Sequence, residues 1–235
     1  FSLRRQRQMC IRDRSTIIAL LISVGLSSIK ALQKAYQTIF FLPYLTNALA
    51  IGAVFATMFS IISPTGTAEG AYSLGLINKI LGTSINWTSI SPENIWANRF
   101  VVIIYEIWAG LPFKILILFG ALQNVNKQYY DAAKVDGANR FTTLMKITVP
   151  LISPMLSYLI ITGFIGGFKA YTAVVGIYGA EKVSNSYINT MVGYIYDQIG
   201  NDSTGLAAAG SLILFGIILV FTLINLAVSK KKVHY

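Results

Sequence analysis

Long apolar segments alternate with shorter polar ones along most of the chain. Four apolar segments cover residues 40–62, 101–122, 155–178 and 206–228, and each is long enough to cross a bilayer, which takes about 20 helical residues. A fifth segment, 15–29, is barely long enough to do so. The pattern predicts an all-α integral membrane protein with five transmembrane helices.

The distribution of lysine and arginine predicts how these helices are oriented. Segment 123–154 carries four basic residues and the tail 229–235 carries three lysines, whereas segment 179–205 carries only Lys182. Because cytoplasmic loops are enriched in Lys and Arg, we expect the tail and segment 123–154 to be cytoplasmic. Segments 63–100 and 179–205 are then external, and the link with Lys30 and Lys34 is cytoplasmic.

The first 14 residues conflict with this orientation, because the same reasoning places their five arginines outside. We therefore expect 1–14 to be a non-native or mis-joined arm in front of a transmembrane domain that covers 15–228. A signal peptide is the alternative for this region, but no A-x-A-like cleavage site follows its apolar part.

Composition supports a membrane protein and excludes several kinds of chemistry. The chain is 54% hydrophobic and 12% charged, compared with about 25% charged residues in soluble domains. Its net charge of +10 comes largely from basic residues beside apolar spans, which does not indicate nucleic-acid binding. Its single cysteine, Cys10, and single histidine, His234, allow no disulfide framework, His-based triad or zinc site. There is also no phosphate-binding glycine-lysine loop, so we expect no cofactor, no enzymatic activity and an energy source in another subunit.

The polar segment 129–154 reads as two short helices joined by a turn. Asp136-Gly137 is a turn signal, since glycine accepts a positive φ. Phe141, Leu144 and Met145 recur at helical spacing and give the second helix one apolar face. Taken alone, this pattern also fits an ordinary amphipathic loop on the membrane surface.

The same segment carries an extended motif with fixed spacings. Asp131-Ala132-Ala133 is followed by three residues and Gly137, then by nine residues and Ile147, and finally by Val149-Pro150. This motif resembles the cytoplasmic loop of binding-protein-dependent ABC importer permeases, with Asp131 in place of the family's Glu and Val149 in place of its Leu. The resemblance implies that the loop is the coupling helix that docks on the ATPase subunit. The residues that it assigns to this coupling loop are Asp131, Ala132, Ala133, Asp136, Gly137, Phe141, Leu144, Ile147 and Pro150.

The resemblance extends over residues 15–228. Phe40-Phe41-Leu42-Pro43 and Asn86-Trp87 are similar to elements of the maltose- and oligosaccharide-type carbohydrate permeases. It implies the type I ABC importer permease fold, whose core has six helices, the first of which is missing here. It also implies a bacterial inner-membrane location and three partners, namely a second permease subunit, a cytoplasmic ATPase dimer and an extracytoplasmic sugar-binding protein.

Polar residues inside the predicted spans are candidates for a solute path, because such groups are costly in lipid. Aromatic faces next to hydrogen-bonding groups suit a sugar, and Gly110 and Pro112 can break or kink their helix. The alternatives are structural pairing or snorkelling for the charged groups and simple packing for the aromatic rings. The candidates are Glu106, Trp108, Lys114, Phe168, Lys169 and Tyr171.

Other functions stay open at the level of sequence. A self-sufficient secondary transporter or channel would need no ATPase, and the loop motif would then be accidental. An ABC permease for a non-sugar solute, a membrane-integral enzyme and an inactive copy are further alternatives. The motif in 129–150 favours the sugar importer permease.

Overall fold

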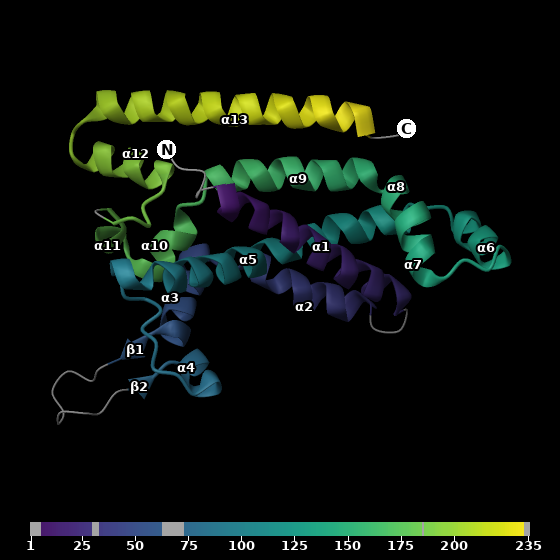
Figure 1. Ribbon diagram of the computed structural model, residues 1–235, viewed down its shortest axis with the longest axis horizontal. Coiled ribbons are helices and arrows are strands. Elements are labelled where there is room, and N and C mark those ends of the chain that lie inside the picture. Colours follow the sequence, from purple (N-terminus) through teal and green to yellow (C-terminus); the bar gives the residue numbers. More distant parts are fainter. Residues whose placement is uncertain (1–5, 30–32, 63–72, 185, 233–235) are drawn as a thin grey trace. The chain divides into compact units, whose positions relative to one another are not determined.

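The computed structural model describes residues 6–29, 33–62, 73–184 and 186–232, with only the backbone described at 6–14, 28, 33–34, 62, 73 and 230–232. The chain is almost entirely helical (Figure 1), as predicted. The exception is a pair of two-residue strands, β1 (Ile61–Ile62) and β2 (Ser73–Leu74), which are antiparallel with Ile61 opposite Leu74.

The chain forms two compact units. Unit 1 comprises residues 1–45, 107–167 and 216–235, and unit 2 comprises 46–106 and 168–215. Both segments predicted to be external, 63–100 and 179–205, fall in unit 2. The segments predicted to be cytoplasmic, including 123–154 and the tail, fall in unit 1. The division therefore follows the sidedness expected from the basic residues.

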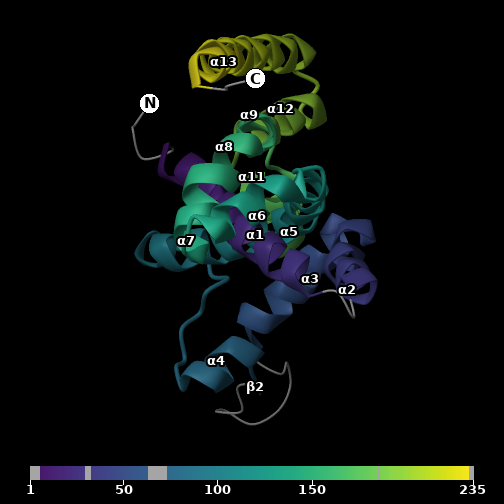
Figure 2. The ribbon, with the colours of Figure 1, turned by 90° about the vertical axis from the view of Figure 1, so that its right-hand side faces the viewer.

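Unit 1 is built on helices α1 (Gln6–Ser28), α2 (Gln33–Leu45) and α9 (Ser153–Phe168), with the second part of α5 (Ile95–Gln123) and of α13 (Thr204–Lys232). Between α5 and α9 lie α6 (Lys127–Val135), α7 (Arg140–Thr143), a π-helical turn (Leu144–Thr148) and α8 (Val149–Leu151). Helix α9 runs beside the second part of α13 (Figures 1 and 2), and the rings of Phe164 and Phe221 lie 5.3 Å apart.

The core of unit 1 joins α1 to α5 and α9. In lipid, helices associate through close packing and interhelical hydrogen bonds because the tails are as apolar as the side chains. The hydroxyl of Ser23 shows one such bond, since it donates to the carbonyl of Ile115 at 3.2 Å as well as to that of Ala19. The buried residues of this core are Ala19, Leu26, Ile115, Leu118, Phe119, Leu122, Ile152 and Leu159.

Unit 2 contains α3 (Ala48–Phe59), α4 (Leu76–Leu81), a 3-10 turn (Pro92–Asn94), α10 (Thr172–Tyr178), α11 (Ala180–Ser184) and α12 (Met191–Gly200). It also holds the first parts of α5 and α13. Helices α3 and α10 cross at Gly52 and Gly176, where a Cβ added to Gly52 would lie 2.6 Å from the Cα of Gly176. The absence of a side chain at Gly52 therefore permits this close approach.

The predicted span 40–62 is wrong as a single helix. Helix α2 ends at Leu45 and α3 begins at Ala48, with Asn47 between them. The side-chain oxygen of Asn47 accepts the N–H of Leu49 at 2.9 Å, so it caps a new helix and satisfies a donor that would otherwise have no partner. The hydropathy of this segment does not reveal the break, because the residues on both sides of it are apolar.

The predicted span 155–178 is also wrong as a single helix. Helix α9 ends at Phe168, just after Gly166-Gly167, and α10 starts at Thr172. Glycine costs about 1 kcal/mol relative to alanine inside a helix, so two in succession favour an end here. By contrast, 101–122 lies within α5 and 206–228 lies within α13, as predicted.

Two described helical stretches are long and apolar enough to cross a membrane, Pro92–Gln123 and Thr204–Ser229. The count becomes four if each of two bent helix pairs, Ala35–Leu45 with Ala48–Phe59 and Arg140–Leu151 with Ser153–Phe168, forms one span. The segment predicted as the first span is represented by a shorter apolar helix, Ser15–Ser27.

Candidate functional site

The polar segment between α5 and α9 folds as two short helices around a tight turn, as predicted. Gly137 has a φ of +70°, a conformation that favours glycine because glycine has no Cβ. Around it, the N–H of Ala138 donates to the carbonyl of Ala133 at 2.9 Å, and that of Gly137 to Lys134 at 3.1 Å. These bonds satisfy carbonyls at the end of α6 and fix the direction in which the chain leaves it.

Two asparagines that the motif does not include begin the helices. Asn126 accepts the N–H of Gln128 at 3.0 Å ahead of α6, and Asn139 accepts the N–H of Thr142 at 2.6 Å ahead of α7. Asparagine is among the preferred residues at this position, so capping preference was a signal that could have identified both.

The second helix continues as a π-helical turn, Leu144–Thr148, before α8. The N–H of Val149 donates to the carbonyl of Leu144, five residues back. Pro150 follows directly, and a proline has no N–H and clashes with the carbonyl four residues before it in an α-helix. The wider turn relieves that clash at Lys146, which explains why an otherwise helical segment departs from α geometry here.

The two helices are held to each other on their inner side. Ala133 and Thr148 are both only 4% exposed, and the Thr148 hydroxyl donates to the Tyr130 hydroxyl at 3.3 Å. Of the remaining coupling-loop residues, Leu144 and Ile147 are half-buried, and the others are exposed: Asp131, Ala132, Asp136, Gly137, Phe141 and Pro150. The loop is therefore a small packed unit with an accessible outer surface.

An ion pair stabilises the outer side of α6. The ammonium of Lys134 donates to the Asp131 carboxylate at 2.8 Å, and this hydrogen bond lowers the pKa of Asp131 below its usual range. A carboxylate with a lowered pKa favours folding above its unfolded pKa and loses that contribution as the pH falls through the folded pKa. The pair is therefore intact at neutral pH, although its exposure to solvent makes its contribution to stability small.

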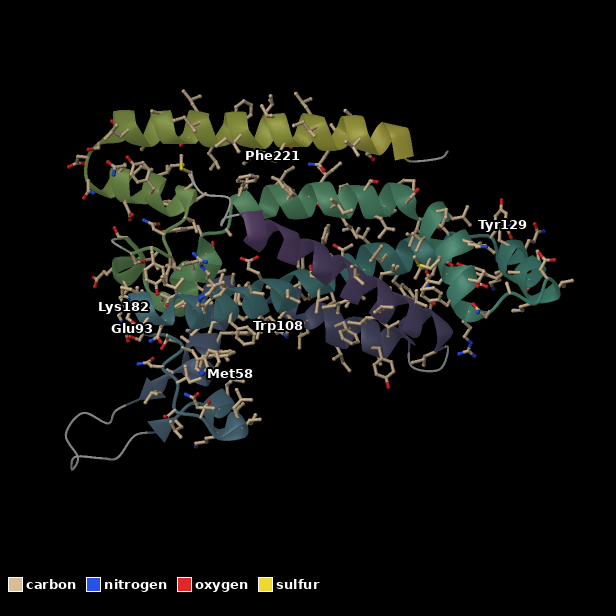
Figure 3. All side chains as sticks on the ribbon, in the orientation of Figure 1. Met58, Glu93, Trp108, Tyr129, Lys182 and Phe221 are labelled. Atoms are coloured by element: carbon tan, nitrogen blue, oxygen red, sulfur yellow. The ribbon has the colours of Figure 1, made fainter. Side chains whose placement is uncertain are left out.

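Large apolar side chains lie on the outer surface of the loop. Phe141 is 70% exposed and Met145 is 51% exposed, on consecutive turns of one helix. Val135, at the end of α6, is 89% exposed, and Tyr129 projects from the start of α6 (Figure 3). Val135 and Tyr129 were missed in the sequence, where helical spacing was considered only for the second helix. Exposed apolar residues gathered with charged neighbours are typical of a protein interaction site.

The candidate path residues divide between the units. Trp108 and Lys114 lie in unit 1, whereas Glu106, Phe168, Lys169 and Tyr171 lie in unit 2. In unit 2, Tyr171 stacks on Tyr196 with ring centroids 4.7 Å apart, and Lys169 is exposed. Tyr105, next to Glu106, is buried and donates to the carbonyl of Ala48 at 2.9 Å, so it joins α5 to α3.

Lys114 is bound inside unit 1. It is 6% exposed, and its ammonium donates to the hydroxyls of Ser15 and of Thr16, the latter at 3.0 Å. These partners lie on α1, so the contact joins α1 to α5. The environment favours the structural interpretation of Lys114 over contact with a solute.

The helix is not broken at Gly110 and Pro112, the residues considered able to break or kink it. Helix α5 is continuous from Ile95 to Gln123 with Pro112 inside it. Prolines are tolerated in membrane helices because neighbouring groups compensate for the lost hydrogen bond.

Comparison with known proteins places these features in a family. Residues 15–234 match the family described as "Binding-protein-dependent transport system inner membrane component". A probable ABC transporter permease of Mycoplasma genitalium is 30% identical over 203 residues, which are 86% of this chain and 58% of that protein. The arabinooligosaccharides transport permease AraP of Bacillus subtilis is 28% identical over 214 residues, 90% of this chain and 65% of that protein. The chain thus spans less than two thirds of these relatives.

Solved structures agree on the fold. A bacterial ABC transporter described as importing the acidic polysaccharide alginate has a chain that superposes with a TM-score of 0.73 at 18% identity, covering 96% of this chain and 77% of that one. The match supports the type I ABC importer permease fold. The family match supports an inner-membrane protein that crosses the bilayer several times. By its match over residues 15–234, the chain belongs to the family of binding-protein-dependent transport system inner membrane components.

Proposed function

We propose that this chain is the permease subunit of an ATP-driven importer, and that it forms part of the membrane path for a sugar. The observation that carries the proposal is the loop between α5 and α9, a packed two-helix unit that exposes Phe141 and Met145. Relatives named as permeases for arabinooligosaccharides and for trehalose or maltose support the choice of a sugar.

ATP hydrolysis belongs to a separate subunit in this proposal. The loop 129–150 is the surface on which the ATPase docks, with Phe141 and Met145 in an apolar groove of the partner. The hydrogen bond between Thr148 and Tyr130, beside the buried Ala133 and Thr148, supports movement of the loop as one piece. Closure of two ATPase subunits on ATP would then shift the attached helices as rigid bodies, which links the nucleotide site to the solute path.

The path itself is proposed to use Glu106, Trp108, Phe168, Lys169 and Tyr171. Their aromatic faces and polar groups suit a hydroxylated solute. A second permease subunit completes the path, and an external binding protein delivers the sugar. The basic residues of 123–154 and of the tail support a cytoplasmic loop and C-terminus.

The proposal is tested by co-purification of the membrane complex with its ATPase. Phe141→Asp removes an exposed apolar anchor and adds a charge, so ATPase retention is expected to fall on the order of 10- to 100-fold, as for an interface hot spot. Gln128→Asp adds the same charge on exposed α6 without removing an apolar group, and it should retain the ATPase. Equal retention by both variants, or no ATPase bound to the unaltered chain, would point to a self-sufficient transporter instead.

A further inference from the structure

Unit 2 carries an open, mostly polar pocket of about 560 Å³. One wall comes from the segment before α5 and contains Asn86, Thr88 and Ser89. The other wall comes from α11 and the residues after it, and contains Lys182 and Ser186. Both walls belong to the segments 63–100 and 179–205 that the basic residues predict to be external.

The two walls are fixed to each other through Asn98, a fully buried residue on the first turns of α5. Its side-chain nitrogen donates to the carbonyl of Trp87 at 2.7 Å and to that of Ser89 at 3.1 Å. From the other wall, the Tyr187 hydroxyl donates to the Asn98 side-chain oxygen and to the Ser91 carbonyl.

A second buried asparagine strengthens the first wall. The side-chain nitrogen of Asn78 donates to the carbonyl of Ile85 at 2.9 Å, and its oxygen accepts the indole N–H of Trp87 at 2.8 Å. Buried networks of this kind give rigid surfaces when their polar groups are satisfied. Binding of a partner in the pocket therefore loses little free energy to the ordering of loops in this chain.

The chemistry of the pocket favours an anionic group. Lys182 is the one charged residue in its lining, and it is exposed. Among the described residues its ammonium has no hydrogen-bond or ion-pair partner. The hydroxyl of Thr88 donates to the Asn86 side-chain oxygen, which leaves the amide N–H groups of Asn86 as donors. An ammonium beside amide donors matches a carboxylate, with which it forms a charge-assisted hydrogen bond.

We propose that this pocket receives an aspartate or glutamate side chain of the external binding protein. The inference rests on the proposed function, which requires such a partner outside the membrane. A small solute is ordinarily enclosed over most of its surface, whereas this pocket is open and suits a projecting group of a larger molecule. The contact fixes where the binding protein sits on unit 2, and it makes docking sensitive to salt.

The test uses the assembled importer in lipid bilayers with its own purified binding protein, loaded with sugar. ATPase activity is measured against binding-protein concentration, at low and at physiological salt. Lys182→Glu is expected to raise at least 10-fold the binding-protein concentration that gives half-maximal ATPase activity. Lys182→Gln should raise it by a smaller factor and weaken its dependence on salt. Lys79→Glu makes the same charge change on an exposed residue of α4 outside the pocket lining, and should leave the curve unchanged.

A compensating change identifies the partner group. Acidic residues on the docking face of the binding protein are changed to lysine one at a time, and one of them should restore the half-maximal concentration of the Lys182→Glu importer. If Lys182→Glu and Lys79→Glu behave alike while the unaltered importer is stimulated, the pocket proposal is overturned and the permease function stands. If the unaltered importer is not stimulated by its binding protein, both proposals fall.

Discussion

Lys114 is a charged residue in a membrane helix, which suggests a function, but its hydrogen bonds favour a structural role. A lysine inside a membrane helix suggests a solute path when only its own helix is considered. Its ammonium is instead held by hydroxyls of Ser15 and Thr16 on α1. Sequence could not show this, because the partners lie about a hundred positions away and depend on which helices pack together. Gly137 is the opposite case, since the local sequence Asp136-Gly137 is enough to predict a turn with a positive φ.

At the residue scale we predict that Lys114→Met destabilises the protein. The substitution keeps the apolar stem but removes charged hydrogen bonds worth about 1.5–3 kcal/mol, so the melting temperature should fall by roughly 3–12 °C. Lys169→Met, at an exposed lysine, should change the melting temperature little. Thermal unfolding of the purified permease measures both. Unchanged melting of Lys114→Met together with lost sugar uptake would return Lys114 to the solute path.

The helices show where hydropathy predicts structure well and where it does not. Residues 101–122 and 206–228 were located correctly because each is apolar within one continuous helix. Segments 40–62 and 155–178 were misjudged because apolar residues continue on both sides of a break. Their breaks depend on local features, the Asn47 cap and the Gly166-Gly167 pair, which an average over 20 residues does not detect. The π-helical turn was likewise not anticipated, although Pro150 supplies its physical cause.

At the element scale we predict that Pro150→Ala uncouples transport from ATP hydrolysis. Alanine supplies an N–H and removes the clash with the Lys146 carbonyl, so the π-helical turn can relax to α geometry. One residue of register then rotates α7 by about 100° relative to α8, which misdirects Phe141 and Met145. Sugar uptake per ATP hydrolysed should fall several-fold in reconstituted vesicles.

Pro154→Ala is the matched control for this change. Pro154 is the second residue of α9, where a helix N–H has no intrahelical partner in any case, so its replacement should be neutral. Equal coupling ratios in the two variants would show that the π-helical turn has no part in transmission.

For the whole molecule, the two units separate the segments that the basic residues predict to be external from those that they predict to be cytoplasmic. Both segments expected outside lie in unit 2, and the loop with its family motif lies in unit 1. The division into two units was not predicted from the sequence, and the sidedness of the segments stays a prediction. The membership of the candidate path residues in two different units was not predictable, because it depends on how α5 and α9 divide between the units.

Sidedness is predicted at this scale and can be measured by labelling single cysteines. In a chain with Cys10→Ser, Lys79→Cys should react with a membrane-impermeant maleimide added outside intact cells. Lys127→Cys, which is also at an exposed position, should react only after the membrane is opened. Both residues are lysines at exposed positions, so a difference in labelling reports location. The reverse pattern would overturn the orientation and, with it, the cytoplasmic assignment of the loop.

The crossing of α3 and α10 has a consequence for how this gene can vary. A Cβ at Gly52 would meet the backbone of Gly176 at 2.6 Å, and backbone atoms, unlike the end of a flexible side chain, cannot turn aside. Every missense change at the Gly52 codon adds that atom, alanine included, so conservative and radical alleles should fail alike. Gly110 and Gly120 have open space where a Cβ would be, and their codons should accept small residues. In a library of variants under selection for transport, glycine should then be the only residue recovered at position 52.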